Sequence, residues 1–344
     1  VALPTVLDSL IPGLDRVYLW SVAGWDVYLT WVLVGVVGSA GMTILNVRGV
    51  RMAAVLQTVV VGLILLVGLA FILGSVARGN TSSLQPFFED GFSGITLVLV
   101  MVPFMFVGFD TIPQAAEEIN LPFRDIGTVL MLAVFMGVAW YGLIILGVGM
   151  MLSPEEYEST DLAAAKANAM IYGGFGRFAM LSAGLAGIIT SWNAFIVGGS
   201  RAIYALSRAK LLPEIFGELH PIYRTPKNAI LLIGILSMIG PFFGRPVLVW
   251  LVNAGGLGVV IAYSMVALSF LVLRDREPDL QRPFRVRFGR LVGGAAFVLS
   301  IGLALLYMPG SPSALLWPSE WVIFIGWCVV GAVMYFMAPK NRTG

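Results

Sequence analysis

The stretch VPFMFVGFDTIPQAAEEINLPFRD, residues 102–125, interrupts an apolar segment with a carboxylate, a glycine and prolines. The residues from Ile95 to Phe109 would span about 22 Å as a helix, whereas the hydrocarbon core of a membrane is about 30 Å thick. The segment must therefore continue past Asp110 to cross, which places Asp110 inside the membrane. A charge there costs a few kcal/mol and usually faces a cavity with a function.

The same stretch predicts a break in the helix near residues 106–110. Pro113 has no N–H, and its ring opposes the carbonyl of Phe109, while Gly108 can adopt conformations that other residues avoid. Carbonyls at the end of the outer half-helix carry partial negative charge and suit a substrate ammonium or an ion. Alternatively, Asp110 is only the N-cap of a second half-helix, accepting the N–H of residue 112.

The composition extends this membrane assignment to the whole chain. Its 344 residues are 58% hydrophobic and only 12% charged, whereas soluble domains carry about 25% charged residues. Period-2 alternation typical of a membrane barrel is rare, so we expect an all-α, polytopic membrane protein. Nine apolar spans are predicted near 27–46, 52–77, 93–118, 126–151, 176–206, 228–243, 246–273, 290–308 and 316–337. We expect them to form a single transmembrane domain over residues 27–344, after a segment at 1–26.

The distribution of positive charge predicts the orientation in the membrane. If the nine spans alternate, 16 of the 21 Lys and Arg residues fall on one side and 5 on the other. Short cytoplasmic loops attract such an excess. We therefore expect a cytoplasmic C-terminus in a plasma or inner membrane, with residues 1–26 outside the cell. Since an odd number of spans leaves the two ends on opposite sides, we also expect earlier helices to be missing from this chain.

Other classes of function lack the residues they need. Cys328 and His220 are the single cysteine and histidine, which cannot form a zinc site. An enzyme needs a nucleophile with a base or metal ligands, and the acid counted inside the spans is Asp110, with scattered Ser, Thr and Asn. A channel filter would show rings of charge or repeated carbonyl motifs. We expect no enzymatic activity, metal, cofactor or nucleic-acid partner.

Four motifs, in order, resemble those of the amino acid–polyamine–organocation (APC) transporter family. They are NVRGVR (46–51), FMFVGFDTIPQAAEEINLPFRDIG (104–127), GSRAIYALSRAKLLP (199–213) and LVLRDREPDLQRPFRV (271–286). The resemblance implies twelve helices, of which the first ten form two inverted five-helix repeats, and the nine spans would be helices 4–12. The family's first helix, which binds the substrate carboxylate, would then be absent.

The resemblance also implies substrate-binding roles on the broken segment. Phe104 matches the aromatic residue that covers the substrate on its outer side. The segment whose carbonyls hold the amino group matches Phe106, Val107 and Gly108. Asp110 matches an acidic position that some members use in proton or substrate coupling.

Further roles are implied on other helices. Ser191 and Asn193 match polar positions that face the site, and Thr190 with Ser191 resembles a hydroxyl pair that binds sodium in related symporters. Asn253 is expected either near the permeation path or as a polar packing residue. Ile64 stands where some proton-coupled members carry a lysine. The coupling ion, H⁺ or Na⁺, therefore stays open.

Two acids and an arginine follow the broken segment. Glu117 and Glu118 precede Arg124 at the expected cytoplasmic end. They are either ordinary interfacial charges or an inner gate made and broken by ion pairs.

The sequence as a whole predicts a secondary active transporter that works by alternating access around the break. Aromatic and aliphatic site residues favour a neutral amino acid as the substrate, while Asp110 also suits a related amine. The alternatives are a polyamine or amine exchanger of the same fold, and a membrane channel or scaffold without transport. The predicted partners are a small-molecule substrate and the lipid bilayer, and the oligomeric state stays open.

Overall fold

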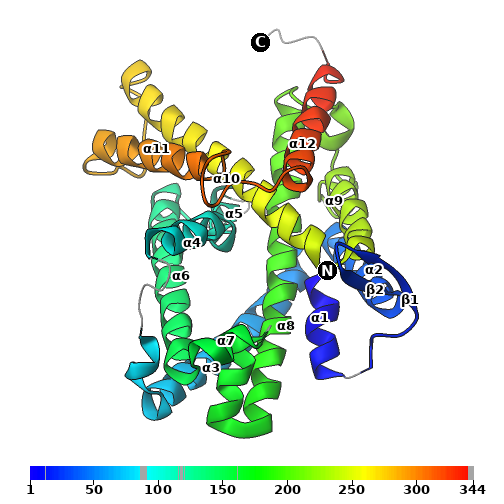
Figure 1. Ribbon diagram of the computed structural model, residues 1–344. Coiled ribbons are helices and arrows are strands. Elements are labelled where there is room, and N and C mark those ends of the chain that lie inside the picture. Colours follow the sequence, from blue (N-terminus) through cyan, green and yellow to red (C-terminus); the bar gives the residue numbers. More distant parts are fainter. Residues whose placement is uncertain are drawn as a thin grey trace. The chain divides into compact units, whose positions relative to one another are not determined.

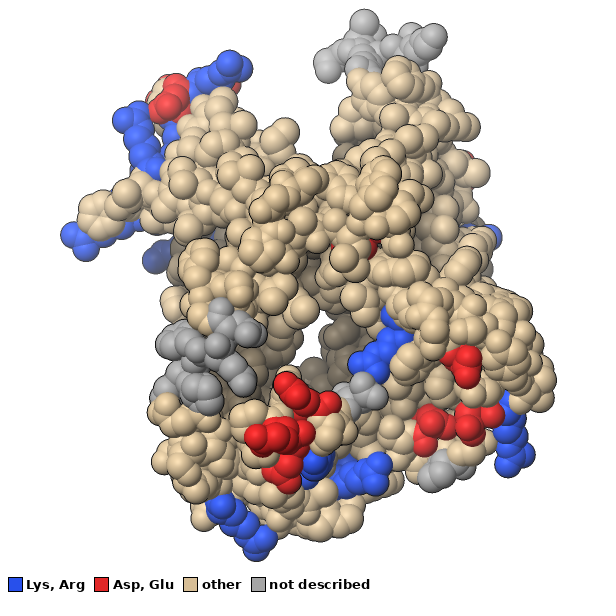
Figure 2. All heavy atoms as spheres, in the orientation of Figure 1, with Lys and Arg blue, Asp and Glu red and all other residues tan. Residues whose placement is uncertain are grey.

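The computed structural model describes residues 1–11, 13–85, 91–114, 116, 119, 121–160 and 162–339, without the side chains of 50–54 and 56. In this part of the chain, eight helical stretches are long and apolar enough to cross a membrane. Most of the surface visible in Figure 2 is uncharged, and charged side chains gather in a few clusters. The predicted all-α, polytopic class is therefore confirmed.

One difference concerns the number of spans. The stretch Lys227–Arg276 contains two of the nine predicted spans. Within it, α9 (Lys227–Ile239) runs through the 3₁₀ turn η4 (Gly240–Phe243) into α10 (Gly244–Arg276). Gly244 has φ 69° and ψ −169°, a conformation open to glycine, so the direction of the chain changes without an intervening loop.

The chain divides into two compact units, and each is described here by itself. The first unit comprises residues 1–87, 135–246 and 337–344. Its elements are α1 (Ala2–Leu10), β1 (Tyr18–Val22), β2 (Trp25–Tyr28), α2 (Leu29–Arg48), α3 (Val50–Arg78), η1 (Thr81–Leu84), the second part of α6 (Phe123–Met151), α7 (Pro154–Glu158), α8 (Ala163–Arg208), η3 (Glu214–Gly217), α9 and η4.

Helix packing in the first unit depends on small residues. Contacts join α3 to α8 and α2 to α9 (Figure 1). A Cβ atom at Gly35 of α2 would overlap the ring of Pro241, and one at Gly68 of α3 would overlap the indole of Trp140. In lipid, where apolar burial does not drive helix association, such close approaches provide the van der Waals contact. Gly35 and Gly68 thus allow close packing between segments of the first unit.

The N-terminal segment contains a hairpin that the sequence analysis did not predict. Strands β1 and β2 pair antiparallel, with Ser21 opposite Asp26. Ala23 and Gly24 connect them with φ of 50° and 81°, the pair of positive values that a two-residue hairpin turn requires. The Trp20 indole N–H donates to the carbonyl of Phe242 at 2.9 Å. Within the first unit, the hairpin is therefore fixed to η4.

A second difference concerns the start of the span predicted near 176–206. Helix α8 already begins at Ala163, and its backbone departs from helical geometry only at Gly173, with φ 65° and ψ −151°. Glycine tolerates this conformation because it has no Cβ. The glycine cluster at 173–178 therefore marks a kink within a long helical stretch rather than the start of a span.

The second unit comprises residues 88–134 and 247–336. Its elements are α4 (Gly91–Phe106), α5 (Thr111–Gln114), the first part of α6, α10 from Val247 on, α11 (Gly289–Leu306) and α12 (Ser319–Phe336). Its core contains Val100, Leu257, Val260, Tyr307 and Leu315. The Tyr307 hydroxyl donates to the carbonyl of Val100 at 2.7 Å, which ties the residue after α11 to the middle of α4.

Candidate functional site: a discontinuous helix

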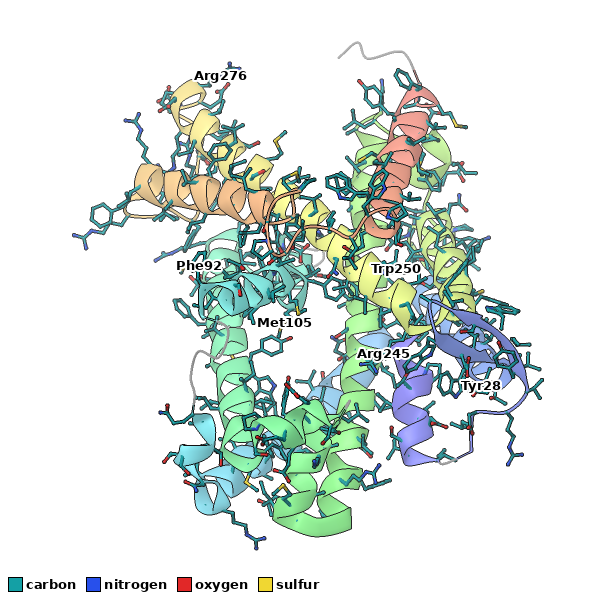
Figure 3. All side chains as sticks on the ribbon, viewed as in Figure 1. Tyr28, Phe92, Met105, Arg245, Trp250 and Arg276 are labelled. Atoms are coloured by element: carbon teal, nitrogen blue, oxygen red, sulfur yellow. The ribbon has the colours of Figure 1, made fainter. Side chains whose placement is uncertain are left out.

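The predicted break in the third span is present. Helix α4 ends at Phe106, and α5 begins at Thr111. Met105, labelled in Figure 3, lies in the last turn of α4. Between them Gly108 has φ 129°, outside the range that side-chain-bearing residues readily adopt. A tight turn follows, in which the Thr111 N–H donates to the Gly108 carbonyl at 3.1 Å. The glycine is therefore a geometric requirement of the break.

Asp110 holds the break together in a way that the sequence analysis did not predict. Its Oδ1 accepts the backbone N–H of Gly108 at 2.8 Å, and its Oδ2 accepts the side-chain amide of Gln114 at 3.2 Å. The expected cap on residue 112 is not formed, because the Ile112 N–H donates to the Phe109 carbonyl at 3.2 Å. The carboxylate thus reaches back to the glycine and forward to α5.

The carbonyl groups of the break differ in their availability. The Phe104 carbonyl accepts the Val107 N–H at 3.3 Å, and the Gly108 carbonyl accepts Thr111. The Val107 carbonyl receives no hydrogen bond from any residue that the structure describes. The hydrogen-bonding capacity of the Val107 carbonyl is therefore unused within the described chain, whereas that of the Gly108 carbonyl is used.

An aromatic neighbour that the sequence analysis missed lies beside the break. The ring of Phe109 lies 5.6 Å from that of Tyr263 on α10, centroid to centroid. The Tyr263 hydroxyl is buried and has no hydrogen-bond partner among the described residues. A buried tyrosine hydroxyl usually finds a partner, so Tyr263 joins the candidate site. The sequence feature that could have identified Tyr263 was a polar aromatic residue inside an otherwise apolar span.

The other expected site residues lie on α8, in the first unit. The Thr190 hydroxyl donates to the Gly187 carbonyl at 3.0 Å, whereas the side chain of Ser191 is exposed. The break belongs to the second unit. The structure therefore describes the two groups separately, each within its own unit.

Asn193 is part of a polar network between helices. Its amide group donates to the side chain of Gln57 on α3 at 3.0 Å and accepts from that of Asn46 on α2 at 2.9 Å. Asn46 also donates to the carbonyl of Met42. Hydrogen bonds of this kind, between side-chain amide groups on different helices, stabilise membrane helix bundles. Within the first unit, Asn193 thus joins α2, α3 and α8, and neither Asn46 nor Gln57 was identified from the sequence as a partner.

Ile64, where the resemblance implies a lysine in some proton-coupled members, lines an apolar pocket of about 460 Å³ in the first unit. Trp140, Met180 and Gly187 also line it. A lysine at position 64 would place a charge among apolar groups, which is costly without a partner. The isoleucine suits this environment.

A second intramembrane carboxylate corrects the expected inventory of one acid. Glu320, in the first turn of α12, is 1% exposed. Its Oε1 accepts the side-chain amide of Asn253 on α10, and its Oε2 accepts the N–H of Leu316, both at 2.7 Å. The sequence analysis missed Glu320 because it lies near the end of its span. Asn253 thereby has a defined hydrogen-bond partner, as expected of a polar packing residue, and a position near the permeation path stays a prediction.

The remaining candidates are placed only in part. Glu117 and Glu118 lie outside the described residues. Arg124 is exposed in the first turn of α6. No group of three or more His, Cys, Asp or Glu side chains arranged to hold a metal ion occurs among the described residues.

The geometry defines a multi-pass helical membrane protein with one span broken at a glycine beside a carboxylate. The chain belongs to the amino acid permease family, whose model matches residues 15–340. It is 27% identical to the methylthioribose transporter of Bacillus subtilis, over 98% of this chain and 74% of that protein. It is 27% identical to the branched-chain amino acid permease BcaP of the same organism, over 88% of this chain and 63% of that protein.

A further relative has a name that points to another substrate class. The low-affinity putrescine importer PlaP of Escherichia coli is 28% identical over 75% of this chain and 61% of its own length. The chain thus spans about three-fifths to three-quarters of these three relatives.

Proposed function

We propose that this protein is a secondary active transporter of amino acids or related amines. The observation that supports the proposal most is the discontinuity between α4 and α5, with Gly108 at φ 129° and the Asp110 carboxylate bonded to its N–H. Irregular backbone at membrane depth is tolerated where it is buried in protein or lines a cavity. In secondary transporters, such interruptions bind substrates and coupling ions.

The proposed substrate group is an ammonium beside the C-terminal end of α4. The last carbonyls of a helix carry partial negative charge, and the Val107 carbonyl has no partner among the described residues. The Asp110 carboxylate adds a full negative charge close to Gly108. Phe104, Phe106 and Val107 would contact the apolar part of the solute. Ser191 and Asn193 on α8 are kept as separate candidates for substrate binding.

The aromatic and aliphatic character of these residues favours a neutral amino acid, and a polyamine or other amine is the second candidate. The names of the relatives include both a branched-chain amino acid permease and a putrescine importer. We propose Asp110, with Thr190 and Ser191, as candidates for H⁺ or Na⁺ coupling. Glu117, Glu118 and Arg124 are proposed as an inner gate at the cytoplasmic end of the break.

The test is uptake of radiolabelled amino acids and of putrescine by the full-length protein in proteoliposomes, with an imposed proton or sodium gradient. Saturable uptake that accumulates substrate and shows counterflow supports a transporter. Steady single-channel currents would instead indicate a channel, and no flux of any tested solute would favour a scaffold.

Two substitutions connect transport to the break. Asp110→Asn keeps an oxygen for the Gly108 N–H but removes the charge, so we expect amine binding to weaken about tenfold. Gly108→Ala has free space for its methyl group, so it tests the backbone conformation alone. Gly255→Ala is the matched control, since Gly255 is a helical glycine with free space around it and no positive φ. Uptake unchanged in both Asp110→Asn and Gly108→Ala would contradict the proposed mechanism.

A further inference from the structure

A pocket of about 530 Å³ lies at the connection between α10 and α11, within the second unit. Four arginines line it, namely Arg274, Arg282, Arg287 and Arg290, and none of its described lining residues is an acid. Blue side chains are concentrated around this helix pair in Figure 2. Four positive charges around one pocket repel one another, so each needs a compensating partner.

Two of the four guanidinium groups already have partners within the connection. Arg282 donates to the carbonyls of Leu273, Glu277, Pro278 and Leu280 at 2.7–3.1 Å. It thereby closes the end of α10 and shapes the pocket wall. Arg290 forms an ion pair with Asp275 at 2.7 Å, and both side chains are largely exposed.

The other two arginines have no acidic partner in the described part of the chain. Arg274 stacks on the ring of Phe270 at 4.5 Å, and its Nε is buried without a hydrogen bond from or to any described residue. Its guanidinium lies directly against Gly289, where any Cβ atom would overlap it. The guanidinium of Arg287 lies 5.5 Å from the ring of Phe288. Two guanidinium groups without an acidic partner among the described residues thus line one pocket, which suits an anion.

We propose that this arginine pocket binds the phosphate of an anionic membrane lipid. Guanidinium groups match phosphate oxygens in a two-pronged geometry, and basic pockets between membrane helices bind phosphate-bearing headgroups. A lipid fits better than a free anion because apolar side chains adjoin the arginines. Phe288 is 62% exposed and Leu291 is 72% exposed, and both line the pocket. They would contact the acyl chains while Arg274 and Arg287 hold the phosphate.

The test titrates the purified full-length protein in detergent with dioctanoyl phosphatidylglycerol and follows the melting temperature. Dioctanoyl phosphatidylcholine and inorganic phosphate are the comparison ligands. We expect a saturable rise with phosphatidylglycerol, since a ligand of the folded state stabilises it by mass action. Arg287→Gln removes the positive charge of an exposed side chain. In this variant we expect the apparent affinity for phosphatidylglycerol to fall about tenfold. Arg274→Gln is the second variant.

Arg276→Gln is the matched control. Arg276 lies two residues from Arg274 at the end of α10 (Figure 3), is exposed, and does not line the pocket. The Arg276→Gln substitution removes the same charge as Arg287→Gln. An equal loss of lipid affinity in the two variants would show general surface attraction and would overturn the proposed binding site. An equal response to phosphatidylcholine, or a full response to inorganic phosphate alone, would overturn the anionic-lipid assignment. Melting temperatures without lipid verify that each variant is folded.

Discussion

At the scale of single residues, polar side chains inside the spans are paired with specific partners. The partners of Asp110 are close in the sequence, whereas those of Asn193 and Glu320 include residues far away in it. Asp110, Asn193 and Glu320 each accept hydrogen bonds from groups that local sequence rules do not identify. An unpaired polar group in such surroundings costs about 1–3 kcal/mol. Removing a hydrogen-bonding side chain should therefore reduce the free energy of unfolding more than neutralising its charge does.

Glu320 provides the clearest test of this expectation. Glu320→Ala leaves the amide of Asn253 and the N–H of Leu316 without acceptors, so we expect a loss of about 2–4 kcal/mol. Glu320→Gln retains one side-chain oxygen as an acceptor and should lose less than half as much. Thermal unfolding of the purified protein in detergent compares the two. An alanine variant as stable as the glutamine variant would contradict the pairing.

Asn193 allows a structural role to be separated from a role in substrate binding. Asn46→Ala and Asn193→Ala remove the same hydrogen bond, so a double-mutant cycle should show a coupling of about 0.5–2 kcal/mol in stability. A purely substrate-binding Asn193 would instead alter the apparent substrate affinity without coupling to Asn46. Additive stability changes would show that the network contributes little.

At the scale of elements, the helices are irregular where glycine permits it and closely packed where glycine replaces a larger residue. Gly108 and Gly173 have positive φ and interrupt helical stretches. Gly35 and Gly68, in contrast, lie in regular helix against the rings of Pro241 and Trp140. The same residue type thus serves two purposes, and its surroundings decide which.

The contact of α3 with α6 can be tested at Gly68. Gly68→Ala places a methyl group on the Trp140 indole, so we expect a destabilisation of about 1–3 kcal/mol from overpacking. Gly62→Ala, on the same helix with no atom within 4 Å of its Cβ, should be neutral or slightly stabilising. Thermal unfolding of both variants measures the difference. A neutral Gly68→Ala would show that Trp140 moves aside easily.

At the scale of the whole molecule, the described part of the chain contains eight long apolar helical stretches, in agreement with its mean hydropathy of +0.91 and with its membership of the amino acid permease family. The orientation in the membrane, inferred from the excess of Lys and Arg on the loops assigned to the cytoplasmic side, remains a prediction. It is independent of the break and of the arginine pocket, so it needs its own experiment.

Labelling of introduced cysteines tests that orientation in the full-length protein. Cys328 is the single cysteine of these 344 residues, so Cys328→Ser, with any cysteine outside them also replaced by serine, provides a background without reactive thiols. We expect Ser82→Cys, in the predicted outer connection, to react with a membrane-impermeant maleimide in intact cells. Asp279→Cys, between α10 and α11, should react only after permeabilisation. Both positions are exposed. The reverse pattern would invert the predicted topology.

The sequence by itself determined the membrane class, most helix positions and the break near Gly108. These features follow from hydropathy and from backbone stereochemistry, which act within one span. The tertiary structure decided that Asn193 joins Asn46, 147 residues away, that Glu320 is buried against Asn253, and that Arg274 and Arg287 line one pocket. Such pairings depend on which helix faces meet, and packing between distant segments sets this. The hairpin at 18–28 was likewise missed, because its short strands are fixed by contacts with η4.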